Sequence, residues 1–217
     1  MNSPLCILIG AGPGVGQAVA RRFAREGFAV ALVARNADKL QLAVVELRGQ
    51  GATAAVYPVD VADFEALKAT LAAIEQTHGP AAVLVYNAAA YSPGSPSAIS
   101  PEQFLRDFDV SVVGALVAAQ QVLPAMRAQG RGTLLFTGGG IADYPDHHAT
   151  SLSFGKTGIR LLATLLHQEL RDTPLKVGTV TIRGGVRPGT HFDPDLIAEA
   201  YWELHTGDNQ AVERTYD

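Results

Sequence analysis

Short apolar runs of strand length alternate with longer segments in which apolar residues recur every three or four positions, along the whole chain. The first run, Leu5–Gly10, is followed by Val15, Val19 and Phe23 at helical spacing, and Gly27 ends this helix. This alternation is typical of repeated strand–helix units around a mostly parallel sheet. The pattern therefore predicts an α/β fold, Rossmann-like and doubly wound, with helices on both faces of the sheet.

The other expected elements follow in the same alternating order. Strands are predicted at Phe28–Ala34, Ala52–Pro58, Ala81–Asn87, Gly132–Thr137 and Leu175–Ile182. Helices are predicted from an Asn36 cap to Gln50, and at Ala62–His78, Phe104–Gln129, Ser151–Arg171 and Pro194–His205. The residues after the last helix are expected to form a short tail. Because the sequence has no fixed-period repeat or low-complexity linker, we expect one domain over residues 1–217.

Composition and charge narrow the class of protein. The 217 residues include 17 Lys and Arg against 21 Asp and Glu, a net charge of −4, so no basic field would hold nucleic acid or an anionic bilayer. No stretch reaches the roughly 18 to 20 uninterrupted apolar residues of a membrane span. We expect a cytoplasmic protein that binds neither nucleic acid nor membrane. The single cysteine, Cys6, lies in an apolar run and is expected in the core.

A glycine-rich segment follows the first strand and opens the first helix. It reads Gly10-Ala-Gly12-Pro-Gly14-Val-Gly16. A tight turn and a close backbone approach need residues without a Cβ, and the free N–H groups of a helix start attract a pyrophosphate. Ordinary turns also collect glycine, but this placement between strand and helix favours a dinucleotide site. Its predicted contacts are Gly10, Gly12, Pro13, Gly14, Val15 and Gly16.

The end of the second strand bears on the choice of cofactor. An acidic residue there would hold a ribose 2′-OH and repel a 2′-phosphate, but the sequence has Ala34 followed by Arg35. A guanidinium can pair with a phosphate through two hydrogen bonds, so NADP is favoured over NAD. The alternatives are that Arg35 is an ordinary solvated residue, and that the nearby Asp38 alters the balance.

The spacing of Gly10, Gly14 and Gly16 resembles the T-G-x-x-x-G-x-G pattern of the short-chain dehydrogenase/reductase family, with Ile9 in place of the Thr. Asp60-Val61 resembles the family's adenine-contacting pair. Asn87-Ala88-Ala89-Ala90 resembles its N-N-A-G motif, with departures at Tyr86 and Ala90. Lys156 matches the lysine that hydrogen-bonds the nicotinamide ribose. The resemblance implies an NAD(P)-dependent oxidoreductase for a small carbonyl or alcohol, with further cofactor contacts from Asp60, Val61, Asn87, Ala88, Ala89 and Lys156.

The proton-transfer residues of that family are missing from this sequence. The family places a Tyr four residues before the Lys, on the same helix face, where the ammonium lowers the phenol pKa. Here that residue is Leu152, and no Tyr anywhere in the chain precedes a Lys by four. The family's Ser aligns best with Gly139, and its Asn with Ser111. Of the four catalytic positions only Lys156 remains.

Other side chains near Lys156 are candidate substitutes for the missing Tyr. Tyr144, His147 and His148 lie in the loop before the helix of Lys156, and Ser153 lies three residues before it. Each is more commonly a loop or cap residue without chemistry. Two adjacent histidines and scattered others do not have the spacing of a metal site, so no metal is expected.

Two functions therefore stay open. One is an NADP(H)-dependent oxidoreductase with an atypical or degraded proton-transfer site. The other is a catalytically inactive NADP(H)-binding protein, acting as a sensor or partner subunit. The helices Phe104–Gln129 and Ser151–Arg171 are apolar around much of their circumference, which predicts a homodimer interface; the alternative is a fully internal helix pair in a monomer.

Overall fold

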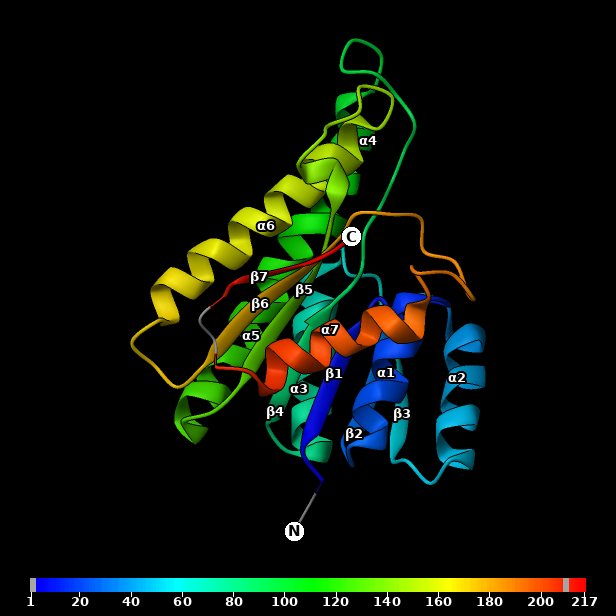
Figure 1. Ribbon diagram of the computed structural model, residues 1–217. Coiled ribbons are helices and arrows are strands. Elements are labelled where there is room, and N and C mark those ends of the chain that lie inside the picture. Colours follow the sequence, from blue (N-terminus) through cyan, green and yellow to red (C-terminus); the bar gives the residue numbers. More distant parts are fainter. Residues whose placement is uncertain (1–2, 209–210) are drawn as a thin grey trace.

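The computed structural model describes residues 3–208 and 211–217, and within them a seven-stranded sheet forms the centre of the molecule (Figure 1). All its strand pairs are parallel, in the order β3-β2-β1-β4-β5-β6-β7. The strands are β1 Leu5–Ile9, β2 Ala29–Ala34, β3 Ala54–Pro58, β4 Ala81–Tyr86, β5 Thr133–Gly139, β6 Lys176–Ile182 and β7 Glu213–Tyr216. The predicted fold class is confirmed.

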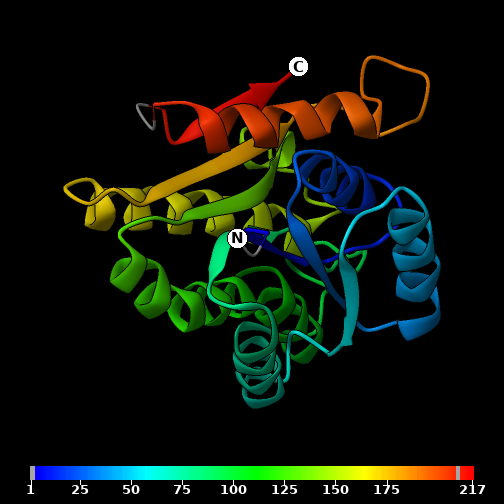
Figure 2. The ribbon, with the colours of Figure 1, turned by 90° about the horizontal axis from the view of Figure 1, so that it is seen from below.

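Helices cover both faces of the sheet (Figure 2). One face is covered by α1 Val15–Arg25, α2 Ala37–Gly49 and α7 Pro194–Thr206, and the other by α3 Phe64–His78, α5 Gly114–Gln129 and α6 Thr150–Leu170. Alternate residues of a strand enter opposite cores: Ile7 packs on the α3–α5–α6 side, whereas Cys6 and Leu8 pack on the α1–α2–α7 side. Cys6 is buried, as expected, and burial raises the pKa of its thiol, so it is an unreactive core residue.

The strand order reverses between β1 and β4, and this reversal creates the site. In the order 3-2-1-4-5, chain crossovers leave β1 toward one side and β4 toward the other, so a crevice opens at their carboxyl ends. Ile9 pairs with Tyr86 at the ends of these strands. The next residues, Gly10 and Asn87, therefore begin the two loops that flank the crevice.

The long helix predicted at Phe104–Gln129 differs from the observed one. It begins earlier, as α4 Pro101–Phe108, because the Ser100 side chain accepts a hydrogen bond from Gln103 N (3.2 Å) and Pro101 fits the first helical position. A wider turn, η1 Asp109–Val113, then leads into α5. By length and composition, residues 101–129 would pass for a membrane span, but α5 packs against the sheet and α3 as a core helix.

The predicted tail was also wrong, because residues Glu213–Tyr216 form β7. This strand pairs in parallel with β6, with Thr179 opposite Glu213 and Ile182 opposite Tyr216. The strand was not predicted because its charged residues do not form an apolar run. Glu213 is tolerated in the strand because its carboxylate accepts hydrogen bonds from Thr181 and from the Arg160 guanidinium.

Candidate functional site

The glycines of the β1–α1 loop have distinct structural requirements. Gly10 has φ 86°, and a Cβ there would lie 2.4 Å from Ala88 N, so this position needs the close approach of two backbones. A Cβ on Gly16 would lie 2.4 Å from Gly10 O, where α1 crosses the end of β1. A Cβ on Gly12, by contrast, would have nothing within 4 Å. Gly12 therefore borders open space, which fits a loop that leaves room for a phosphate group.

A cavity of about 600 Å³ lies beside this loop. Its lining brings together several predicted cofactor residues from distant parts of the chain: Pro13, Gly14 and Val15 from the loop, Asn87 after β4, and Lys156 from α6. The remaining lining comes from the end of β5, the end of β6 and the loop before α7 (Thr137, Gly138, Ile182, Gly184, Val186, Pro188 and Pro194). We refer to this space as the cofactor cavity.

A buried hydrogen-bond chain forms the floor of the cofactor cavity. The Asn87 side chain donates to Gly10 O (2.8 Å) and accepts from Thr137 Oγ1 (2.8 Å). Since the one hydroxyl proton of Thr137 is used in this way, the Tyr201 hydroxyl donates to Thr137 Oγ1 (2.6 Å). Burial raises the pKa of Tyr201, so it is a neutral donor. The sequence did not predict the contact between Thr137 and Tyr201, because it joins residues 64 positions apart.

Lys156 lies at the inner end of the cofactor cavity. Its Nζ donates a hydrogen bond to Thr137 O (2.8 Å), which fixes the side chain over the end of β5. Burial lowers the pKa of Lys156 to about 8. The ammonium is therefore still the main form at neutral pH, but it gives up its proton more readily than an ordinary lysine does.

A second cavity, of about 710 Å³, adjoins the first and shares Lys156, Ile182 and Gly184 with it. We refer to it as the substrate cavity. Gly139 and Leu152, which the sequence analysis aligns with the family's Ser and Tyr, both line it. Its other lining residues are Gly140, Ile141, Tyr144, Asp146, Arg183 and Asp217.

The candidate substitutes for the Tyr differ in their burial and in whether they line the substrate cavity. Tyr144 lines the substrate cavity and is largely exposed. Ser153 is buried, and its hydroxyl accepts from Asp146 N (3.2 Å), so it caps a turn. His147 and His148 are exposed and lie ring against ring, with centroids 3.9 Å apart. Ser111 lies in η1, where its hydroxyl accepts from Ala90 N (3.1 Å) in the loop after β4, and it lines neither cavity.

Asp146, His147 and His148 bring their ligand atoms within 4.8 Å of one another, a grouping that the sequence analysis did not expect. The three are consecutive residues of one exposed loop. Three adjacent exposed side chains leave most of a coordination sphere to water, and we assign no metal to them.

An ion-pair network supports one wall of the substrate cavity. Arg183 donates to Asp143 (2.9 Å), and Asp143 also accepts from Arg160 (2.8 Å). Arg160 in turn donates to Glu213 of β7 (2.7 Å). Hydrogen bonds from Arg160 and Arg183 hold the pKa of the Asp143 carboxyl below its usual range. The network thus ties α6, β6 and β7 together behind the cavity.

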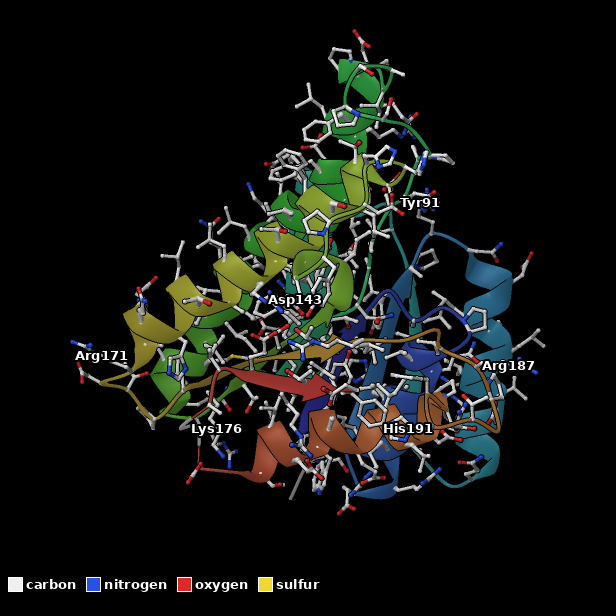
Figure 3. All side chains as sticks on the ribbon, turned by 45° about the horizontal axis from the view of Figure 1, so that its top comes forward. Tyr91, Asp143, Arg171, Lys176, Arg187 and His191 are labelled. Carbon is white, nitrogen blue, oxygen red and sulfur yellow. The ribbon has the colours of Figure 1, made fainter. Side chains whose placement is uncertain are left out.

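The short segment between β6 and α7 is anchored to β7. Figure 3 shows the loop that carries Arg187 and His191 running from the end of β6 toward α1 and α2. The His191 ring stacks on Tyr216 with centroids 5.2 Å apart, and its Nε2 lies 2.7 Å from Asp217 O. The Phe192 ring occupies the space that a Cβ on Gly184 would need. These contacts anchor the segment at the side of the two cavities, where Gly184, Val186 and Pro188 line the cofactor cavity.

The predicted adenine-end residues line the carboxyl edge of β2 and β3 and lie beyond the cofactor cavity. Ala34 and Pro58 pair at the ends of these strands, so Arg35 and Asp60 lie just past neighbouring ends. Arg35 is exposed, Asp60 caps a turn by accepting from Ala62 N (3.1 Å), and Val61 is buried. Ala88 is partly buried and Ala89 exposed in the loop after β4.

Comparisons with known proteins agree on one family. The sequence matches the short chain dehydrogenase family over residues 5–191. It is 29% identical to 2,3-dihydro-2,3-dihydroxybenzoate dehydrogenase of Bacillus subtilis, over 97% of this chain and 77% of the relative.

Solved structures give the same result. A metagenomic short-chain oxidoreductase in complex with NADP is 26% identical, with a TM-score of 0.90 over 99% of this chain and 97% of the other. Actinorhodin polyketide ketoreductase with NADPH, at 24% identity, shares the fold with a TM-score of 0.90 over 100% and 98% of the two chains.

Proposed function

Because the chain belongs to the short-chain dehydrogenase family, we propose that it is an NADP(H)-dependent oxidoreductase acting on a small carbonyl or alcohol substrate. When bound, the dinucleotide would supply or accept the hydride. The observation that supports the proposal most is the junction of the cofactor and substrate cavities at Lys156. A side chain at that junction can hold the nicotinamide ribose and face a substrate from the same place.

The residues along the crevice suit each part of NADP. The helix start at Gly12, Gly14 and Val15 offers N–H groups and open space to a pyrophosphate. Arg35, exposed beyond β2, offers a guanidinium to the 2′-phosphate. The complex of the metagenomic relative with NADP supports this choice over NAD. Asp60, Val61, Asn87, Ala88 and Ala89 would complete the adenine and ribose contacts.

A direct test separates binding from turnover. Titration with NADPH, followed by its fluorescence, should give saturable binding. A panel of aldehydes, ketones and enones, followed by loss of NADPH absorbance, should then include at least one substrate. Failure to bind NADPH at millimolar concentration would refute the proposed function.

The alternative is a catalytically inactive NADP(H)-binding protein that acts as a sensor or partner subunit. Leu152 and Gly139 favour it, because neither can donate a proton. It predicts the same NADPH binding, but no oxidation of NADPH with any member of the panel.

We also propose that the active form is a homodimer, a cytoplasmic assembly of single-domain chains. A stripe on α6 made of Phe154, Leu161 and Leu165 is more than half exposed. Leu105 of α4 and Leu116 of α5 add exposed apolar surface on helices next to it. Burying these side chains against a second copy would remove apolar area from water.

A further inference from the structure

The substrate cavity has Gly139 and Leu152 at the two positions that align with the family's Ser and Tyr, so Lys156 stands beside them without that hydroxyl pair. A Cβ on Gly139 would lie 3.5 Å from Cγ of Lys156 and 3.6 Å from its Cε, so the lysine stem borders the space that a Ser would fill. Leu152 lies one turn before Lys156 on α6 and faces the same cavity. No side chain from these two positions can stand between Lys156 and a substrate as a proton carrier.

We propose that Lys156 is itself the proton donor for carbonyl reduction, and that the cavity selects ketones activated by an adjacent electron-withdrawing carbonyl. This inference rests on the proposed function. It goes further by assigning to Lys156 the step that a tyrosine performs elsewhere, in addition to holding the ribose.

Reduction of the carbonyl needs one hydride and one proton. A bound NADPH would supply the hydride from C4 of its ring to the carbonyl carbon and would become NADP⁺. The N–H bond of the Lys156 ammonium breaks, and its proton forms the O–H bond of the product alcohol. The neutral amine then recovers a proton from water, which reaches it through the open substrate cavity.

The surroundings of Lys156 suit it to this step. Its Nζ donates to a carbonyl, Thr137 O, which leaves two of its three N–H groups for other acceptors. The charged and titratable groups that line the same cavity are Tyr144, Asp146, Arg183 and Asp217, and Tyr201 lies one hydrogen bond behind Thr137. Because burial lowers the pKa of Lys156 to about 8, its ammonium is a stronger acid than an ordinary lysine near neutral pH.

The class of substrate follows from what the cavity lacks. A Ser hydroxyl at position 139 would share in stabilising the negative charge on the carbonyl oxygen, and Gly139 has none. A neighbouring carbonyl on the substrate withdraws electrons and so stabilises the negative charge that develops on the reacting oxygen, which makes one donor enough. Leu152, Ile141 and Ile182 offer the organic part of such a molecule an apolar lining.

The kinetic test compares 1-phenyl-1,2-propanedione with acetophenone as probes. Wild type should reduce the diketone with NADPH at least about 100-fold faster than acetophenone, and kcat should fall above pH 8 as the ammonium is lost. Lys156→Arg keeps a cation that can donate to Thr137 O and to the ribose, but arginine does not release a proton in this range. Its kcat should drop about 10²-fold, with the NADPH Kd within about threefold of wild type.

A second readout does not depend on turnover. The chain has only four lysines, Lys39, Lys68, Lys156 and Lys176. In a protein labelled with ¹³C at lysine Cε, one NMR resonance should titrate near pH 8 without cofactor, and it should be absent from Lys156→Arg. Lys176→Arg, at the far end of β6 (Figure 3), is the matched control and should keep both that resonance and the wild-type kcat.

Three kinds of result would overturn the role proposed for Lys156. A normal kcat in Lys156→Arg, or the absence of a lysine that titrates between pH 7 and 9, would overturn the proposal. A loss of kcat in Tyr144→Phe as large as that in Lys156→Arg would move the donor to Tyr144 and overturn it as well. Binding of NADPH without reduction of the diketone would overturn the role of Lys156 while leaving cofactor binding intact. Failure to bind NADPH at all would instead refute the proposed function.

Discussion

Gly10 and Gly12 lie in the same loop, but Gly10 is crowded by a neighbouring backbone and Gly12 borders open space. Substitution of Gly10 should therefore affect stability, and substitution of Gly12 should affect cofactor binding. Gly10→Ala would bring a Cβ to 2.4 Å from Ala88 N at φ 86°, so we expect a loss of stability of several kcal/mol, about 3 or more, seen as a large fall in Tm. Gly12→Ala adds its Cβ to open space and should keep the wild-type Tm. It should nevertheless raise the NADPH Kd about tenfold or more, because the methyl group would occupy the space proposed for phosphate. Equal loss of Tm in both variants would contradict this assignment.

Arg35 gives the cofactor preference a test of its own. Because a hydrogen-bonded ion pair contributes about 1.5–3 kcal/mol, Arg35→Ala should raise the NADPH Kd about 10- to 100-fold. The NADH Kd should stay near its wild-type value, since NADH lacks the 2′-phosphate. Arg25→Ala removes an equally exposed arginine from the end of α1 and should change neither constant. An unchanged NADPH Kd in Arg35→Ala would withdraw the preference for NADP.

At individual positions, the sequence was most informative where the backbone imposes the residue type. A glycine at positive φ, such as Gly10 or Gly14, is visible in a sequence because few other residues adopt that conformation. Thr137 and Tyr201 gave no comparable signal. A β-branched residue is ordinary in a strand, and a Tyr is ordinary in a helix. Their role depends on α7 crossing β5, which local spacing does not reveal.

At the level of elements, α7 is joined to the start of β5 by a histidine that titrates. A 2.9 Å hydrogen bond links His205 Nδ1 and Thr133 Oγ1, and burial, with the nearby Lys176 charge, lowers the His205 pKa from 6.5 to about 4. The fold thus disfavours protonation of His205, while the unfolded chain takes up a proton near pH 6.5. The contribution of His205 to stability is complete above pH 6.5 and is lost as pH falls toward 4.

Substitution should remove this pH dependence. The free energy of unfolding of the wild type should decrease between pH 6.5 and 4 more steeply than that of His205→Gln, by at most about 1.4 kcal/mol per pH unit. Urea unfolding at several pH values measures both slopes. His148→Gln, in an exposed loop, should retain the wild-type slope. Parallel curves for wild type and His205→Gln would contradict the assignment.

Helices and strands with apolar patterns could be predicted from the sequence, whereas the strand with charged residues could not. The six strands with apolar runs were placed within two residues of their observed ends. β7 was missed because Glu213 and Arg214 interrupt its apolar pattern, and because Arg160, the partner of Glu213, lies 53 positions away in the sequence. The wider turn η1 was missed because its residues continue the helical periodicity of α4 and α5.

At the scale of the whole molecule, the apolar stripe on α6 predicts assembly. The double substitution Leu161→Glu and Leu165→Glu places two charges in the middle of the proposed interface, where burial without partners is unfavourable. Light scattering should give a dimer for wild type and a monomer for this variant. Leu42→Glu alters a leucine on α2 that is even more exposed (74%), on the opposite face of the sheet, and should leave the dimer intact. A monomeric wild type would contradict the prediction.

The two ends of the described chain lie in very different places. Figure 1 shows the two termini well apart. Pro4 lies beside Phe28, Ala82 and Thr133 near the amino ends of their strands, whereas Asp217 lines the substrate cavity. Any polypeptide joined after Asp217 would begin beside the cavity that we propose for the substrate. An affinity tag for the assays above therefore belongs at the amino terminus. A tag fused to the carboxyl terminus is expected to obstruct substrate entry and so to raise KM.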